Sequence, residues 1–201
     1  MPAGDAEDMC ETPEGRRRAN IFFVESTGNK CLTARQACSV ESAARTNPHA
    51  NITVYMQATM LTDHMFDWNA GLPIRHRSCR ITDSLSQFHN VKFHYSELVE
   101  YTRDTPLWGL NSAGEYNESN YPVHHRSDAG RVAILWKYGG IYLDLDCMVL
   151  HPLHCLQNTV GMNPNSHHIN WLENSVLIFD AGHPFLNQLM KYVLMPLDGH
   201  C

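Results

Sequence analysis

The segment Ser127–Leu150, SDAGRVAILWKYGGIYLDLDCMVL, predicts a helix, a glycine turn and a buried strand that ends at two carboxylates. Ser127 is a good N-cap residue, and Asp128 would lie where the positive end of a helix dipole favours an anion. Apolar residues then recur at helical spacing as far as Trp136. Gly139-Gly140 is expected to end the helix, with Gly139 at the left-handed C′ position.

After the glycine pair, residues 141–143 are β-prone, and leucines alternate with Asp144 and Asp146. In extended backbone the two aspartates would point the same way, with Cα atoms roughly 6.5–7 Å apart. Neighbouring carboxylates repel each other, and burial raises their pKa values unless a cation lies near. A hard divalent cation, Mg²⁺ or Mn²⁺, bound to phosphate oxygens would resolve that conflict. From the tripeptide alone, a solvated acidic strand end is the commoner interpretation.

Four blocks of sequence, in matching order, resemble one family. They are NIFFVEST (20–27), CSVESAARTNP (38–48), RDTPL (103–107) and the pattern SDxxR followed by GGxYLDxD (127–146). They resemble the DXD-containing glycosyltransferases of the lactosylceramide 4-α-galactosyltransferase and α-1,4-N-acetylglucosaminyltransferase family. The resemblance covers roughly Asn20 to Leu194. It implies an α/β chain with the Rossmann-like GT-A fold of nucleotide-sugar transferases, from which a C-terminal section of the family is expected to be missing.

The resemblance also implies a reaction. A hexose, galactose or an N-acetylhexosamine, would move from a UDP-sugar to a galactose-terminated glycolipid or glycan in α-1,4 linkage, with retained configuration. Asp146 would coordinate Mn²⁺ (or Mg²⁺) together with Asp144. The residues that the resemblance places at the donor are Asp128, Arg131, Tyr142, Asp144 and Asn174.

Some assignments stay open. Asp128 and Arg131 share a helix face, where an ordinary intrahelical ion pair is the other interpretation. No catalytic nucleophile is assigned. Within the family a further histidine commonly completes the metal sphere, and His151, His154 or His200 would have to serve here. The alternative function is a truncated, non-catalytic relative that binds UDP or a partner transferase. A phosphohydrolase would need the further acidic or histidine ligands of a two-metal site.

The composition sets limits on the function. With 201 residues, 43% of them hydrophobic, the chain can bury a core as one domain. With a net charge of −6, the chain lacks the excess of basic residues that is typical of nucleic-acid-binding domains. Residues 1–18 are polar and expected to be disordered, and residues 19–201 form the expected catalytic domain. The resemblance implies a membrane-associated enzyme of the Golgi lumen, yet the chain has no signal peptide and no apolar run of about 18 residues that could anchor it.

Seven cysteines are an odd number, so at least one thiol would be free even in an oxidising lumen. Cys31 with Cys38 is one conceivable disulfide, although sequence alone does not determine the pairing. Two glycosylation sequons, at Asn51 and Asn117, fit a lumenal glycoprotein.

Periodicity and turn residues assign most of the remaining chain. A loop over the site is expected at residues 111–125, and its His124 and His125 are expected at the surface. The last helix would have Phe185, Leu189, Tyr192 and Val193 as its apolar face. Residues 60–78 are left unassigned. The expected strands are 21–24, 51–56, 91–95 and 171–179, and the expected helices are 32–46, 84–88, 97–101 and 183–194.

Overall fold

The computed structural model describes residues 19–57, 66–67, 72–73, 79–109, 120–163 and 171–193. The segment 1–18, expected to be disordered, lies outside these ranges, as do Asn117 and His200. None of the helices in the described part of the chain combines the length and the apolar character that spanning a bilayer requires.

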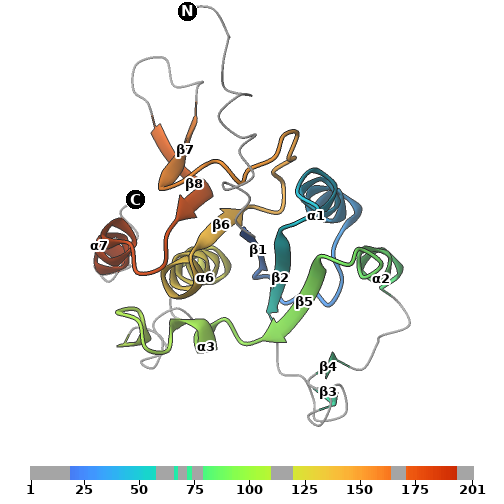
Figure 1. The fold of residues 1–201 in the computed structure, drawn as a ribbon. Coiled ribbons are helices and arrows are strands. Elements are labelled where there is room, and N and C mark those ends of the chain that lie inside the picture. The colour runs from blue at the N-terminus through green and yellow to red at the C-terminus, as the bar shows by residue number, and fades with distance from the viewer. Residues whose placement is uncertain are drawn as a thin grey trace, which may run out of the picture.

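A mixed six-stranded sheet forms the centre of the fold, in the order β5-β2-β1-β6-β8-β7 (Figure 1). The first four of these strands are parallel, β8 is antiparallel to β6, and β7 is antiparallel to β8. The strands are β1 (Asn20–Glu25), β2 (Asn51–Gln57), β5 (Val91–Ser96), β6 (Gly140–Leu143), β7 (Thr159–Asn163) and β8 (Trp171–Phe179). A separate antiparallel pair joins β3 (Phe66–Asp67) to β4 (Leu72–Pro73).

Helices cover both faces of the sheet, with α1 and α2 on one side and α6 and α7 on the other (Figure 1). Because side chains alternate along a strand, Phe22 and Phe23 of β1 enter different hydrophobic clusters. Phe22 packs in the cluster that contains Leu135 of α6, whereas Phe23 packs in the cluster that contains Val40 of α1. The helices are α1 (Ala34–Thr46), α2 (Arg80–Leu85), α3 (Val99–Thr102), α6 (Pro122–Tyr138) and α7 (Pro184–Val193).

Helix α6 begins earlier than its sequence predicts. The N-cap assigned to Ser127 is wrong, because Pro122 opens the helix and Ser127 lies one and a half turns inside it. Proline is well suited to a first helical position, since its fixed φ is already helical and its missing N–H costs nothing there. Asp128 is therefore not at the positive end of the helix dipole. The loop expected as far as His125 is wrong for its last four residues for the same reason.

The glycine pair ends α6 as predicted and starts β6 at once, but the left-handed C′ position assigned to Gly139 is wrong, since Gly139 is the C-cap residue and its ψ is 161°. Gly139 and Gly140 both have positive φ, +60° and +129°. A Cβ atom on Gly140 would lie 2.4 Å from the backbone oxygen of Asn20 in β1. Glycine at this position therefore allows the two central strands to approach each other where β6 begins.

Other expectations differ in detail. The helix predicted at residues 84–88 occurs at 80–85, and strand β7 was not predicted at all. Helix α7 is present, but its predicted buried face is wrong: Leu186 and Met190 are fully buried, whereas Phe185 and Tyr192 are exposed. Leu189 packs at the edge of the same cluster.

A disulfide joins Cys31 to Cys79, so the suggested pairing of Cys31 with Cys38 is wrong. Cys38 faces outward on α1 as a free thiol, and Cys147 is a second free thiol among the described residues. Cys31 instead lies against the start of α2, where the backbone N–H of Leu32 donates to Thr82 Oγ1 over 3.1 Å. The bond thus connects the entry of α1 to the entry of α2.

Replacing Cys79 by serine should lower the free energy of unfolding by about 2–4 kcal/mol, because the bond closes a long loop in the unfolded chain. The sequence separation of the two cysteines is 48. Urea denaturation of oxidised protein measures the effect, with Cys38→Ser as a control that should leave stability unchanged. Peptide mapping that found Cys31 bonded to Cys38 would contradict this pairing.

A second prediction concerns Gly140. We expect Gly140→Ala to destabilise the protein by about 1–3 kcal/mol, since the added methyl group meets backbone and the φ angle is unfavourable. Gly130→Ala is the matched control in α6, where the new Cβ would contact only the Leu98 side chain at 3.4 Å. Alanine has a higher helix propensity than glycine, so the control variant should not lose stability through its backbone. Equal thermal unfolding midpoints for the two variants would show that the strand junction tolerates a side chain.

Candidate donor and metal site

The order of the strands locates a ligand site. From β1 the chain adds β2 and β5 on one side of the sheet, and then β6 on the other side. The order in which strands are added to the sheet therefore reverses between β1 and β6, and this position is called the reversal point below. In open α/β sheets, ligands bind beyond the carboxyl ends of the strands at such a point. Glu25 ends β1 and Asp144 directly follows β6, so two carboxylates flank the expected crevice.

Arg131 is the centre of the polar cluster at this end of the sheet. It projects from the middle of α6, and only 6% of its surface is exposed. One terminal nitrogen, Nη1, lies 3.2 Å from Asp144 Oδ1 and donates to the backbone oxygen of Asn174 over 2.8 Å. The other, Nη2, lies 3.2 Å from Asp128 Oδ1 and donates to Ser127 Oγ over 3.0 Å. The guanidinium thereby joins α6 to the end of β6 and to β8.

Asp144 is held by its neighbours in β6 and β8. Tyr142 Oη donates to Asp144 Oδ1 over 2.6 Å, and the backbone N–H of Asp144 donates to the oxygen of Ser175 over 2.9 Å. The ring of Tyr142 also lies under the guanidinium of Arg131, whose central carbon is 4.8 Å from the ring centroid. Both side-chain contacts use Oδ1, and within the described residues Oδ2 of Asp144 has no recorded partner.

Asp128 and Asn174 contact each other across two elements. Asn174 Nδ2 donates to Asp128 Oδ1 over 2.9 Å, so the first half of β8 is tied to α6 through side chains. The predicted intrahelical pair of Asp128 and Arg131 is present, but it belongs to a network that also includes β6 and β8. An isolated surface pair would contribute little.

The electrostatics of the cluster act on two ionisable groups. Burial raises the pKa of Asp128; Arg131 and the Asn174 amide lower it, while the charge of Asp144 raises it further. Burial also raises the pKa of Tyr142 well above its ordinary value, and the neighbouring Asp144 adds to that shift. The Tyr142 hydroxyl therefore stays protonated at neutral pH and remains a donor to Asp144.

The two aspartates of the Asp144-Leu145-Asp146 motif have different surroundings. The extended course predicted through Asp146 is wrong beyond Leu143, because a turn closes when the N–H of Cys147 donates to the oxygen of Asp144 over 3.0 Å. Asp144 is half-buried, whereas Asp146 is exposed and has no hydrogen bond or ion pair recorded with another described residue.

These carboxylates fit a hard cation that arrives with phosphate. Mg²⁺ typically takes one or two carboxylates and completes its shell with water and phosphate oxygens. Asp146 and the Oδ2 atom of Asp144 would supply such ligands. Within the described ranges no three His, Cys, Asp or Glu side chains form a metal-binding group. His151 and His154, considered above as further ligands, thus belong to no such group.

Glu25, at the other side of the crevice, opens the polar loop 25–28 that the sequence offers as a nucleotide contact, but its burial is not predicted. It is 1% exposed, and its Oε1 accepts from both the N–H (3.1 Å) and the hydroxyl of Thr27. Oε2 is buried without a hydrogen-bond partner among the described residues. Buried polar atoms are normally paired, so an unpaired one suggests a donor outside the described residues. An acidic residue that ends an apolar strand was the only signal in the sequence.

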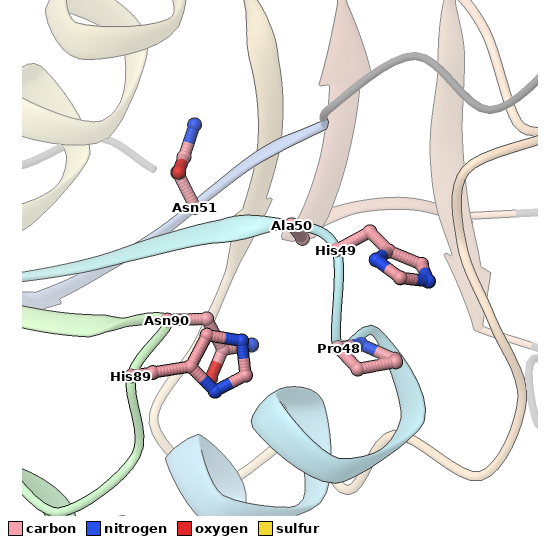
Figure 2. A pocket seen from close by; sticks show the side chains of 6 residues that line it. All are labelled: Pro48, His49, Ala50, Asn51, His89 and Asn90. Atoms are coloured by element: carbon pink, nitrogen blue, oxygen red, sulfur yellow. The ribbon is translucent and has the colours of Figure 1, made fainter.

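The structure thus brings five of the six predicted site residues into one network: Asp128, Arg131, Tyr142, Asp144 and Asn174. Asp146 lies beside this network. A pocket elsewhere, lined by Pro48, His49, Ala50, Asn51, His89 and Asn90, lies at the amino-terminal ends of β2 and β5 (Figure 2). It is at the opposite end of the sheet from the carboxylates and takes no part in the site. Of the two histidines expected at the surface, His124 is exposed and His125 is half-buried.

Arg131→Lys should destabilise the protein by about 1–3 kcal/mol, because a single ammonium cannot satisfy two carboxylates and a carbonyl that the guanidinium spans. Arg45→Lys is the matched control, since Arg45 makes an exposed pair with Glu41 on α1. That change should alter stability by less than about 0.5 kcal/mol. Urea titrations of both variants make the comparison, and equal small losses would contradict a central role for Arg131.

Comparison with known proteins identifies the family. A model described as the glycosyltransferase sugar-binding region containing the DXD motif matches residues 33–167. Human lactosylceramide 4-alpha-galactosyltransferase is 37% identical over 179 residues, which cover 88% of this chain and 46% of that protein. Human alpha-1,4-N-acetylglucosaminyltransferase is 31% identical over 176 residues, which cover 87% of this chain and 47% of that protein. The chain thus spans about half the length of these curated relatives.

Solved structures agree on the fold. The PaToxG glycosyltransferase matches with a TM-score of 0.57 at 16% identity, over 86% of this chain and 58% of that chain. The glycosyltransferase domain of the YGT toxin matches with a TM-score of 0.50 at 11% identity, over 87% of this chain and 62% of that chain. The predicted Rossmann-like GT-A fold is confirmed. With Asp144-Leu145-Asp146 at the carboxyl end of its central sheet, the chain belongs to the family of glycosyltransferases with a DXD-containing sugar-binding region.

Proposed function

We propose that the chain carries the donor site of a metal-dependent, retaining glycosyltransferase. It would move galactose or an N-acetylhexosamine from a UDP-sugar to a galactose-terminated glycolipid or glycan in α-1,4 linkage. The names of the two human relatives support this linkage and these sugars. The observation that carries the proposal is the position of the Arg131 network, with the Asp144 motif beside it, at the reversal point of the sheet.

Asp128, Arg131 and Asn174 would hold the donor sugar. Within the described residues, the contacts of Asp128 use Oδ1, which leaves Oδ2 to accept from a sugar hydroxyl. Burial raises the pKa of Asp128, and the positive charge of Arg131 opposes that rise. A carboxylate fixed by two partners loses little conformational freedom when the donor binds, so the sugar can be oriented at low entropic cost.

Asp146, with Asp144, would hold Mn²⁺ or Mg²⁺. When bound, the cation neutralises charge on the departing diphosphate. Tyr142 keeps Asp144 in place by donating to Oδ1, and this orients Oδ2 independently of the cation. We assign no nucleophile to the retained configuration, because no described carboxylate is tied to that role by its contacts.

Glu25 would contact the nucleoside. It lies across the reversal point from Asp144, and its Oε2 atom has no hydrogen-bond partner in the described part of the chain. The N–H of a uracil ring and the hydroxyls of ribose are donors of the kind that this oxygen lacks. The turn from Glu25 to Thr27 holds the carboxylate at the end of β1.

The setting of the enzyme follows from the same relatives. We propose residues 19–201 as part of the catalytic domain, 1–18 as a disordered segment, and the Golgi lumen as the location, with association to the membrane where glycosphingolipids are made. The relatives' names support the lipid acceptor. The disulfide between Cys31 and Cys79 supports an oxidising compartment.

Calorimetric titration of UDP, with and without Mn²⁺, tests the donor site. We expect binding that requires the metal, and at least about tenfold weaker binding by Asp146→Asn, which corresponds to about 1.4 kcal/mol. The amide retains the size of the carboxylate but loses the charge that a hard cation requires.

Asp104→Asn is the matched control. Asp104 is exposed, and its positive φ of 60° is tolerated by asparagine, so this variant should bind UDP as the parent does. Metal-independent UDP binding, or an Asp146→Asn variant that binds normally, would contradict the proposed metal site. Intact UDP binding without sugar transfer to a galactose-terminated acceptor would contradict the transferase activity of this chain.

A further inference from the structure

We propose that Asn51 carries an N-linked glycan, placed at the end of the sheet opposite the donor site. This inference does not depend on the proposed transferase activity. It depends on how the folded chain presents one of its two sequons, Asn51-Ile52-Thr53, and on the compartment that the disulfide indicates.

The fold exposes the acceptor side chain. Asn51 is the first residue of β2, and because side chains alternate along a strand, it shares a face with Thr53 while Ile52 points to the opposite face. Ile52 is fully buried, whereas Asn51 is exposed and Thr53 is half-buried. The strand is therefore anchored by the middle residue of the sequon, and its acceptor residue faces solvent.

The side-chain amide of Asn51 makes little contact with the rest of the described chain. Among the described residues its recorded side-chain contact is a long hydrogen bond of 3.4 Å from Nδ2 to Asn20 Oδ1. Figure 2 shows the amide nitrogen pointing away from Pro48, His49 and His89, which line the adjacent pocket. The strand is paired at this residue through the backbone, where the N–H donates to the oxygen of Ala19 over 2.9 Å. A sugar attached to Nδ2 would therefore disturb one weak side-chain hydrogen bond and would leave the backbone hydrogen bond of Asn51 intact.

The position keeps a glycan away from the carboxylates. Strand β2 runs from Asn51 to Gln57, parallel to β1 and in register with it, so Asn51 pairs with Asn20 and Met56 with Glu25. At about 3.3 Å per residue, Asn51 lies roughly 17 Å along the sheet from the level of Glu25. A glycan at this end can extend into solvent without covering the reversal point between β1 and β6.

The disulfide provides the independent argument about compartment. Cys31 and Cys79 lie with Cα atoms 5.3 Å apart, in the range that a disulfide requires. Such bonds persist in the secretory lumen, where N-glycosylation also takes place, and are rare in the cytosol. A chain that forms this bond would pass the glycosylation machinery with its sequon still unfolded and would then fold with Asn51 outside.

Expression through the secretory pathway of a eukaryotic cell, followed by mass spectrometry of the peptide that contains Asn51, tests the proposal. Treatment with peptide N-glycosidase should remove a glycan and convert Asn51 to aspartate. The glycan should be absent from Asn51→Gln and from Thr53→Ala, which keeps the asparagine but destroys the sequon. It should persist in Thr53→Ser, which keeps the hydroxyl, and in Asn117→Gln, which removes the second sequon.

One result would overturn the proposal directly. It is an unmodified Asn51 peptide in secreted parent protein whose Cys31–Cys79 bond is shown by peptide mapping. This readout uses the parent chain alone, so it holds even if a variant fails to fold. A glycan confined to Asn117 would equally contradict the assignment to Asn51.

Discussion

The buried guanidinium of Arg131 connects three elements that are distant in the sequence. It contacts Asp128 in its own helix, Asp144 after β6 and the backbone of Asn174 in β8. Two half-buried carboxylates that share one cationic partner repel each other. The guanidinium contacts both of them and offsets this repulsion at the carboxyl end of the sheet. The carboxylate geometry that a donor would meet is thus set by one side chain, which the packing of α6 on the sheet positions.

Local patterns in the sequence predicted a large part of this arrangement. The strand 171–179 was predicted with its exact bounds, because polar residues give way to a continuous apolar run there. The glycine pair at 139–140 marked the end of α6 and the start of β6, since positive φ is a property that glycine supplies locally. Asp128 and Arg131 were placed on one helix face by their spacing alone. These features need no knowledge of the rest of the chain.

The errors have two sources, which are contacts between distant parts of the chain and local signals that compete with one another. Ser127 looked like a helix cap, but its hydroxyl accepts from Arg131 inside the helix. Cys31 pairs with Cys79 rather than its near neighbour because α2 packs beside the entry to α1. The chain leaves the strand direction after Asp144, where the N–H of Cys147 donates to the oxygen of Asp144 and closes a turn. Of these, the cysteine pairing is set by a tertiary contact on which no periodicity in one segment reports, whereas the start of α6 at Pro122 and the turn after Asp144 are local features.

The Glu25 oxygen that has no hydrogen-bond partner among the described residues links ligand binding to the stability of the empty protein. A buried acceptor without a donor costs about 1–3 kcal/mol relative to a paired one. The folded chain bears this cost at the end of β1, the strand that pairs with both β2 and β6. A ligand that donates to this oxygen would recover the cost only in the folded state. Occupancy of the crevice would then raise the melting temperature by more than the ligand's other contacts alone explain.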